Sequence, residues 1–292
     1  MFKSGWALVC FFGIIVLCGN LTCSKAKEST ASHKAQKIIE EILSGSETKT
    51  PVKPFTHTYG FFSVEEAYQI QSLLVEELNE KLGDVSGYKV AFASQAAQKQ
   101  FGIDQPASGP FFRLQRIPDG STLESSDFFG LTIETEVAFT LGKSIDHLLE
   151  NTADLKPYVK WVHASFDISN DYFDSQEAKP VVSDLVASGM TYLYMLGPAV
   201  DPNLVDVDKL NLKLTVNGKI FAEGASADVM GSPWNSLLWL ANQVVSRGDT
   251  LEPGDVVLTG TAAPAYKVPG SEAAGFYEGD CGPLGKVTVT VK

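Results

Sequence analysis

The pattern of hydrophobic and polar positions divides this chain of 292 residues into two parts. In residues 35–86, apolar side chains recur every three or four positions, which is the spacing of an amphipathic helix. A capping box at Ser63 to Glu66 marks the start of the longer predicted helix, and Gly83 marks its end. In residues 87–292, short segments alternate between apolar and polar residues, as strands with one buried face do. We therefore expect a single domain, 35–292, of the α+β class, with N-terminal helices followed by a mixed, strand-rich core.

The core contains several segments whose pattern predicts a defined element. The dipeptide Asn217-Gly218 lies between two alternating runs and predicts a hairpin with a type I′ turn. Residues 102–120 are rich in proline and glycine and predict a loop. Gly45 is expected to end the first helix of the chain. The predicted strands are 87–94, 131–142, 161–168, the two halves of 212–225, 255–261 and 285–291, and the predicted helices are 35–43, 63–82, 95–101 and 232–248.

Residues 1–23 have the features of an export leader. Lys3 precedes an apolar run from Trp6 to Gly19 of about 14 residues, which is shorter than the ~20 residues of a membrane-spanning helix. Three outcomes remain open: lipid attachment at Cys23 as in a bacterial lipoprotein, cleavage after Ala26, or an uncleaved N-terminal anchor. The polar segment 24–34 is predicted to be a tether. We expect an exported protein that is periplasmic or held at a bacterial membrane through Cys23.

Composition and charge exclude some classes of partner. The chain has 23 lysines and arginines against 35 acidic residues, for a formal charge of −12. Only three residues are arginine, so the clustered cations that follow a nucleic-acid backbone are absent, and we expect no nucleic-acid partner. Three of the four cysteines lie in the leader, so the remaining one, Cys281, has no internal disulfide partner.

Three acidic residues lie on the polar faces of two predicted strands. Glu134 and Glu136 are two positions apart in one strand and therefore project to the same side. Asp167 lies on the polar face of the strand 161–168. If the three carboxylates converge, they repel one another unless a cation lies between them, and carboxylate oxygens suit Mg²⁺ or Mn²⁺. The alternative interpretation is a solvated acidic face.

Lys89 interrupts the apolar strand 87–94. A lysine inside such a strand is rarely buried without a charged partner. Burial lowers the pKa of an ammonium group, which would make Lys89 a candidate proton shuttle. The alternative is a lysine at the edge of the sheet whose charged end reaches solvent.

Several segments, taken in order, resemble the 2-keto-4-pentenoate hydratases and 4-oxalocrotonate decarboxylases of the fumarylacetoacetate hydrolase superfamily. The resemblance covers residues 35–292. The segments that carry it are AYQIQ (67–71), GYKVAFAS (87–94), FGIDQP (101–106), IETEVAFTLG (133–142), HASFDIS (163–169), VSDLVASG (182–189), NGKIFAEGA (217–225), SPWNSLLWLANQVVSRG (232–248) and LEPGDVVLTGT (251–261). The resemblance implies the roll or sandwich core of that superfamily and a homo-oligomer.

The resemblance also implies a role for each matching residue. Glu134, Glu136 and Asp167 match the metal ligands, and Lys89 matches the active-site lysine. The substrate-contacting positions of the family correspond to Ser94, Thr259 and Gly260. The implied reaction is a metal-dependent lyase reaction on a 2-oxo or 2-hydroxydienoic acid. Its enolate would be stabilised by Mg²⁺ or Mn²⁺ while Lys89 moves a proton, giving either hydration to a 4-hydroxy-2-oxo acid or decarboxylation.

The chain departs from the family pattern at three places. Ala107 stands where the hydratases carry an acid, Leu185 stands where an asparagine is usual, and Ser169 to Tyr172 lack the usual arginine. The metal-binding part of the pattern is thus retained while polar groups around it are replaced. Two alternatives stay open: an exported relative that binds a metal or ligand without turnover, and a hydrolase that cleaves a C–C bond of an acylpyruvate.

Overall fold

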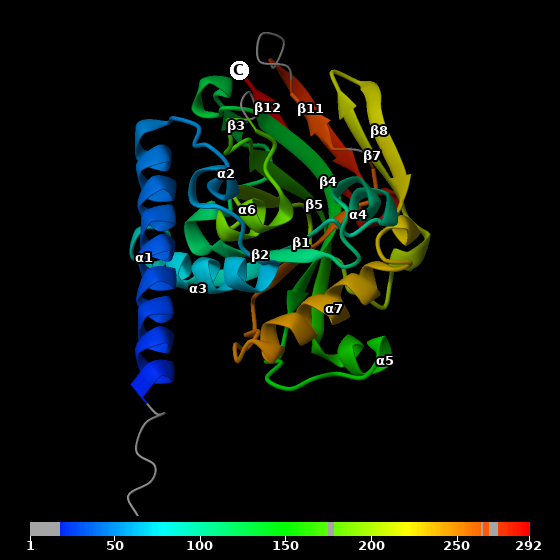
Figure 1. Ribbon diagram of the computed structural model, residues 1–292. Helices are drawn as coiled ribbons and strands as arrows, with labels where there is room; N and C mark the ends of the chain where they lie inside the picture. Colours follow the sequence, from blue (N-terminus) through cyan, green and yellow to red (C-terminus); the bar gives the residue numbers. More distant parts are fainter. Residues whose placement is uncertain (1–17, 175–177, 264, 269–273) are drawn as a thin grey trace, which may run out of the picture.

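Two sheets and a set of flanking helices form the protein (Figure 1). The computed structural model describes residues 18–174, 178–263, 265–268 and 274–292. The larger sheet has the order β2-β1-β9-β4-β5-β6, with β10 also paired to β4, and the smaller sheet has the order β3-β12-β11-β7-β8. The α+β class and the strand-rich core with N-terminal helices are therefore confirmed.

The bounds of the elements follow the order of the chain. The helices are α1 (Cys18–Thr48), α2 (Phe55–Tyr59), α3 (Val64–Leu82), α4 (Gln95–Phe101), α5 (Thr152–Leu155), α6 (Val182–Ala187) and α7 (Pro233–Ser246). The strands are β1 (Val85–Ala91), β2 (Ala107–Phe112), β3 (Thr122–Leu123), β4 (Leu131–Leu141), β5 (Val159–Asn170), β6 (Leu193–Leu196), β7 (Asn211–Val216), β8 (Lys219–Ala225), β9 (Val256–Thr261), β10 (Tyr266–Lys267), β11 (Gly275–Asp280) and β12 (Lys286–Val291).

Local signals in the sequence correspond to observed caps and turns. Ser63 caps α3 in a complete capping box with Glu66, and Gly83 follows its last turn. The side chain of Ser232 caps α7 by accepting a hydrogen bond from a backbone N–H. Asn217 and Gly218 both have positive φ, as a type I′ turn between β7 and β8 requires. These predictions are confirmed because each depends on residues close together in the chain.

The larger sheet rolls up until its two ends meet. The hydroxyl of Thr191, just before β6, donates to the carbonyl oxygen of Pro110 in β2 at 2.7 Å. The rings of Phe111 and Tyr194 pack with their centroids 4.5 Å apart, which joins the same two ends. One face of the sheet is therefore turned inward, and side chains from β1, β4 and β5 can meet across it.

The outer face of this rolled sheet is covered in three areas (Figure 1). Helix α7 packs against one area through Leu237, Leu240 and Ala241. Helices α1, α3 and α6 form a second apolar cluster that includes Ile38 and Leu74. The smaller sheet covers the third area, through residues of β7, β11 and β12 that pack on β4 and β5. Burial of these three clusters holds the roll in shape.

The prediction of a loop over 102–120 is wrong in its centre, because residues 107–112 form the strand β2. Proline and glycine usually interrupt strands, but β2 lies at the end of the strand order, where a missing N–H is tolerated. Gly109 is needed for a close approach: a Cβ there would lie 2.1 Å from the carbonyl oxygen of Gly189. Gly109 and Gly189 thus lie where the two ends of the roll meet.

The N-terminal region also differs from the prediction. Helix α1 runs through the predicted tether 24–34, a segment of helix-forming lysine, alanine and glutamate without proline or glycine. It also passes Gly45, which was expected to end it. A Cβ at Gly45 would lie 2.8 Å from Cγ1 of Val52, so this glycine permits close packing of the next loop.

Most of the predicted leader, residues 1–17, lies outside the described residues, so the leader stays a prediction. Within the part of the chain that the structure describes, none of the helices has the length and hydropathy needed to cross a bilayer.

Closure of the roll can be tested at Thr191. We expect Thr191→Val to lower the free energy of unfolding by about 1 kcal/mol, because the isosteric side chain loses its hydrogen bond to Pro110. Urea unfolding followed by circular dichroism measures this change. Thr290→Val in β12, on the smaller sheet, serves as the control and should change stability less; equal losses in both variants would contradict a role of Thr191 in closing the roll.

Candidate metal centre and active site

Pairing between β4 and β5 brings the three acidic residues together. Glu134 is directly opposite Asp167, and Glu136 is opposite Ser165. Residues opposite each other in an antiparallel pair project to the same face, so all three acids share the inner face of the roll. One carboxylate oxygen from each lies within 4.8 Å of the others. The predicted convergence is present, and it excludes a solvated acidic face because Glu136 and Asp167 are buried.

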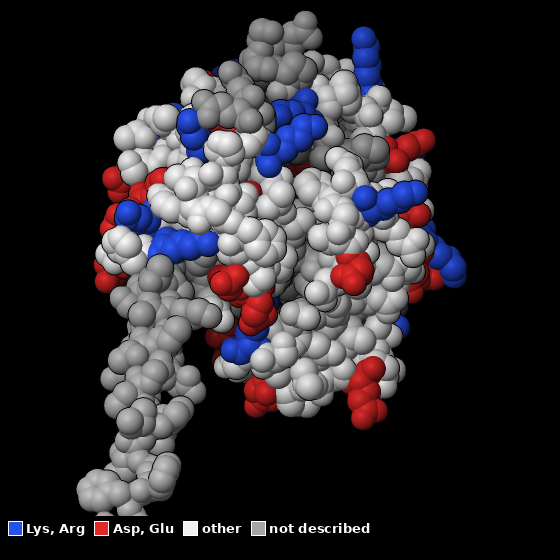
Figure 2. All heavy atoms as spheres, viewed as in Figure 1, with Lys and Arg blue, Asp and Glu red and all other residues white. Residues whose placement is uncertain are grey.

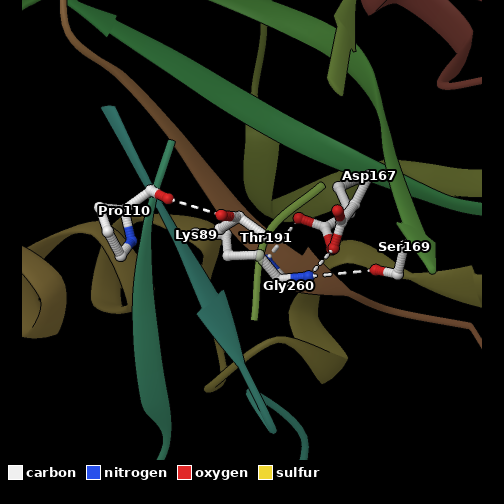
Figure 3. Close-up of polar contacts among 7 residues, drawn as sticks. Lys89, Pro110, Asp167, Ser169, Thr191 and Gly260 are labelled. Atoms are coloured by element: carbon white, nitrogen blue, oxygen red, sulfur yellow. Dashed lines mark hydrogen bonds and ion pairs between the residues drawn. The ribbon is translucent and has the colours of Figure 1, made fainter. Parts of the chain in front are cut away.

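Lys89 reaches the same place from β1 (Figure 3). Strand β1 is connected to β4 through β9, which pairs with both. The ammonium group of Lys89 forms an ion pair with Oδ2 of Asp167 and donates a hydrogen bond to Oγ of Ser169 at 3.3 Å. Since Lys89 is only 5% exposed, the alternative of a lysine that reaches solvent is wrong.

The carboxylate of Glu136 accepts a hydrogen bond from a backbone N–H. The N–H of Gly260 in β9 donates to Oε2 of Glu136 at 2.7 Å. Gly260 has a φ of 95°, and a Cβ at this position would lie 2.5 Å from the Cβ of Ala93. The donor can therefore reach Glu136 only because residue 260 is a glycine.

Burial and mutual repulsion raise the pKa of two of the carboxyl groups. For Glu134, burial and the nearby carboxylate of Asp167 raise the pKa to about 7. For Glu136, burial together with Asp167 and Glu134 raises the pKa well above its usual value, although the Gly260 N–H opposes this. In the absence of a cation, the protein thus retains protons at this site near neutral pH.

The expected lowering of the Lys89 pKa is corrected. Burial does act to lower it, but the negative charges of Asp167, Glu134 and Glu136 together outweigh that effect and the pKa is raised. Desolvation alone lowers the pKa of a buried ammonium. Convergence of three acids around it is what reverses the direction of the shift.

The residues present fit a divalent cation. Oδ1 of Asp167 is buried and has no hydrogen-bond partner among the described residues. Its other oxygen, Oδ2, is taken by Lys89, so Oδ1 is the atom left to face a cation. Three carboxylates and one ammonium, all ionised, leave an excess of two negative charges, which one divalent ion would neutralise. Oxygen ligands of this kind suit a hard ion such as Mg²⁺ or Mn²⁺.

Comparison with protein families shows the family of this chain. Residues 91–285 match the model of the fumarylacetoacetate (FAA) hydrolase C-terminal domain. This match covers more than half of the chain and includes β4 and β5, the strands that carry the three acidic residues. The chain belongs to the fumarylacetoacetate hydrolase family.

Within this family, the chain is similar to several hydratases. It is 28% identical over 237 residues to the 2-keto-4-pentenoate hydratase of Paraburkholderia xenovorans, covering 80% of this chain and 86% of that one. It is 30% identical over 230 residues to the 2-keto-4-pentenoate hydratase of Burkholderia vietnamiensis, covering 77% and 84%. The resemblance to this branch of the family is thus confirmed across the domain.

The fold agrees with solved structures of the family. The 4-oxalocrotonate decarboxylase from Pseudomonas putida G7, complexed with magnesium and adipate, superposes with a TM-score of 0.82 at 20% identity, over 89% of this chain and 98% of that one. Fumarylpyruvate hydrolase from Pseudomonas aeruginosa, in complex with Mn²⁺ and pyruvate, gives 0.52 at 16% identity, over 70% and 88%. Both are similarities of fold.

The three residues predicted to contact substrate lie in three different environments. The hydroxyl of Ser94 caps α4 by accepting from the N–H of Ala97 at 3.2 Å. Thr259 is fully buried, and its hydroxyl donates to the carbonyl oxygen of Val137 at 2.9 Å. Only Gly260 touches the acidic site, through its N–H to Glu136. Their roles in substrate binding stay predictions.

Sequence reasoning missed Ser169 as a member of the site. It lies two positions after Asp167 in β5 and therefore on the same face, so alternation was the signal that could have found it. Its contact with Lys89 depends on β1 crossing nearby, which no local pattern indicates.

The raised pKa values predict how stability depends on pH when no cation is bound. The unfolded chain releases the Glu134 proton near pH 4.5 and the folded protein near pH 7, so ionisation favours unfolding as pH rises through this window. With a chelator present, we expect the melting temperature to fall by about 5 °C or more across it. Scanning fluorimetry measures this change.

Two comparisons isolate the acidic site in that measurement. Glu134→Gln should flatten the fall, because it removes one of the groups that titrate. Mg²⁺ or Mn²⁺ should raise the melting temperature more at pH 8 than at pH 5. A wild-type curve and a Glu134→Gln curve of equal slope would show that the acids do not repel one another as described.

Proposed function

We propose that this protein is a metal-dependent hydro-lyase that converts 2-hydroxy-2,4-dienoic acids to 4-hydroxy-2-oxo acids. The observation that supports it most is the buried ammonium of Lys89, hydrogen-bonded to one of three converging carboxylates. The site thus combines a candidate cation position with a candidate proton donor, which is what chemistry through an enolate needs. The similarity to named 2-keto-4-pentenoate hydratases favours this reaction over others of the family.

Glu134, Glu136 and Asp167 would hold the cation, which we propose is Mg²⁺ or Mn²⁺. Once bound, such an ion supplies a Lewis acid that stabilises negative charge on the C2 oxygen of the substrate. The Gly260 N–H fixes one oxygen of Glu136, and Lys89 fixes one oxygen of Asp167. These two contacts hold the carboxylates in place, so little reorganisation is needed when the ion and substrate bind.

Lys89 would supply the proton during ketonisation. Its ion pair with Asp167 favours the charged ammonium, which can donate a proton to the dienol carbon and later recover one. The product of this step is a conjugated enone, to which water adds at C4. Ser94, Thr259 and Gly260 are the proposed substrate contacts, as the family pattern implies.

Decarboxylation of a related 2-oxo acid is the second candidate. It is favoured by Ala107, which is buried at the start of β2 at the position where the hydratases carry an acid. Loss of CO₂ also passes through an enolate, but it does not require a group that activates water. The same cation site and Lys89 would serve both reactions.

The proposed ligand is a small acid, and no nucleic-acid partner is part of the proposal. On the face shown in Figure 2, lysine and arginine side chains are scattered between acidic ones and form no continuous basic stripe. A stripe of that kind would be needed to follow a nucleic-acid backbone. A homo-oligomer, as the family resemblance implies, remains part of the proposal and can be measured by light scattering.

Activity can be tested on the full chain after chelation and reloading with Mg²⁺ or Mn²⁺. We expect loss of the dienol absorbance of 2-hydroxypenta-2,4-dienoate well above the spontaneous rate. Lys89→Met and Glu136→Gln should each lower kcat/KM by about 100-fold or more, because the first removes the proposed proton donor and the second a proposed cation ligand. Glu223→Gln in β8, an exposed acid of the smaller sheet, is the matched control and should keep full activity.

Parallel assays separate the alternatives. CO₂ release from 4-oxalocrotonate without hydration would favour the decarboxylase, and cleavage of an acylpyruvate would favour the C–C hydrolase. If Mn²⁺ binds but none of these substrates turns over, the protein is a ligand-binding relative and the proposed enzyme activity is wrong.

We also propose that residues 1–23 direct the protein out of the cytoplasm, with Cys23 as the membrane tether. In a bacterial host, the full chain should fractionate with membranes or periplasm, and Cys23→Ser should shift it from the membrane fraction to the soluble one. Labelling with a palmitate analogue measures lipid attachment directly. A soluble, uncleaved full-length chain in the cytoplasm would contradict the export proposal.

A further inference from the structure

Among the residues that the structure describes, Ser169 is the one neutral side chain that hydrogen-bonds to the ammonium of Lys89. A lysine ammonium has three N–H donors and no acceptor. One donor is used by Oδ2 of Asp167 and a second by Oγ of Ser169 at 3.3 Å (Figure 3). The ion pair with Asp167 is explained by charge. The contact with Ser169 is explained neither by the cation site nor by the family pattern.

The backbone around Ser169 is held firmly. Ser169 pairs with Thr132 in β4, and the next residue, Asn170, accepts hydrogen bonds at its Oδ1 from the N–H groups of Phe129 and Gly130 at 2.8 and 3.3 Å. The N–H of Asp171 then donates to the carbonyl oxygen of Gly130 at 2.8 Å. The end of β5 is therefore fixed to the start of β4, and the Ser169 hydroxyl has a defined position.

Two contacts at different positions orient the ammonium, whereas one does not. The lysine ammonium sits on a flexible stem of four carbons. An ion pair with a single carboxylate oxygen therefore leaves the ammonium free to rotate about that contact. A second acceptor, Ser169, fixes the rotation and thereby the direction of the third N–H. Since the ammonium can only donate, the Ser169 oxygen accepts and its own hydrogen points elsewhere.

We propose that Ser169 is a positioning residue that aims the third N–H of Lys89 at the reacting carbon of the substrate. This inference rests on the proposed function, since it assumes that Lys89 transfers a proton. Proton transfer requires the donor within hydrogen-bond reach and correctly aligned, so a freely rotating ammonium would transfer protons more slowly. Ser169 touches neither substrate nor cation in this account, and it acts through Lys89.

Kinetics of three variants test the catalytic part. Ser169→Ala should lower kcat on 2-hydroxypenta-2,4-dienoate by about 10-fold, with KM changed by less than about 2-fold, because binding is retained and alignment is lost. Ser169→Thr keeps a hydroxyl on a strand position that accepts β-branched residues and should recover most of the rate. Ser188→Ala is the matched control: the hydroxyl of this half-buried serine donates to the carbonyl oxygen of Leu185, and its loss should leave kcat unchanged.

The affinity for Mn²⁺ completes that comparison. In Ser169→Ala the dissociation constant for Mn²⁺ should stay within about 2-fold of wild type, because no ligand is removed. A Ser169→Ala variant whose kcat equals that of wild type, or whose loss of rate Ser169→Thr does not recover, overturns the proposal. So does a parallel loss of Mn²⁺ binding, since Ser169 would then act on the cation site.

A measurement without turnover separates this inference from the proposed function. In ¹⁵N-labelled protein, the protected ammonium of Lys89 should give an NMR signal, assigned by its absence in Lys89→Met. Its hydrogen exchange should be about 10-fold faster in Ser169→Ala and unchanged in Ser188→Ala. Unchanged exchange in Ser169→Ala overturns the positioning role even if the enzyme is active. Faster exchange in a protein that turns over none of the substrates supports the orientation by Ser169 and contradicts the proposed function.

Discussion

Repulsion among three carboxylates inside a rolled sheet is the constraint on which the rest of this structure depends. Glu134, Glu136 and Asp167 are held within a few ångströms of one another on strands that cannot move apart without breaking the β4–β5 ladder. One ammonium, that of Lys89, offsets only part of the charge. Burial, together with the remaining negative charge, raises the pKa of Glu134 and Glu136, and a divalent cation would offset that charge.

The roll explains why such an unfavourable arrangement can exist. Its ends meet through Thr191 and Pro110, and its outer face is covered by α7, by the N-terminal helices and by the smaller sheet. Three apolar clusters stabilise the fold from outside, so the inner face can be used for polar groups whose burial is costly. The free energy of burial in the clusters thus supports a site that would not be stable by itself.

The strands of the roll also position single residues around the three acids. Gly260 brings a backbone donor to Glu136 where a side chain would collide with Ala93. Lys89 reaches Asp167 from β1, which is three positions from β5 in the sheet order, and Ser169 contacts Lys89 from the end of β5. Positioning by rigid strands is the common element, and it suits a reaction in which a proton donor and a cation must act on one substrate.

The sequence alone determined whatever depends on neighbouring residues. The capping box at Ser63, the Asn217-Gly218 turn and the alternation that places Glu134 and Glu136 on one face all follow from local geometry, and each is observed. The ordered family segments added the candidate ligands and Lys89, which local patterns could only suggest.

Only the tertiary structure decided the rest. The strand at 107–112 was hidden by Gly109 and Pro110, because a strand's position at the end of the sheet order is not written in its own residues. The pKa of Lys89 rises instead of falling, and Ser169 joins the site, because both depend on strands distant in sequence being brought together. Electrostatic energies and hydrogen bonds act through space, so their sign and partners are fixed only when the chain has folded.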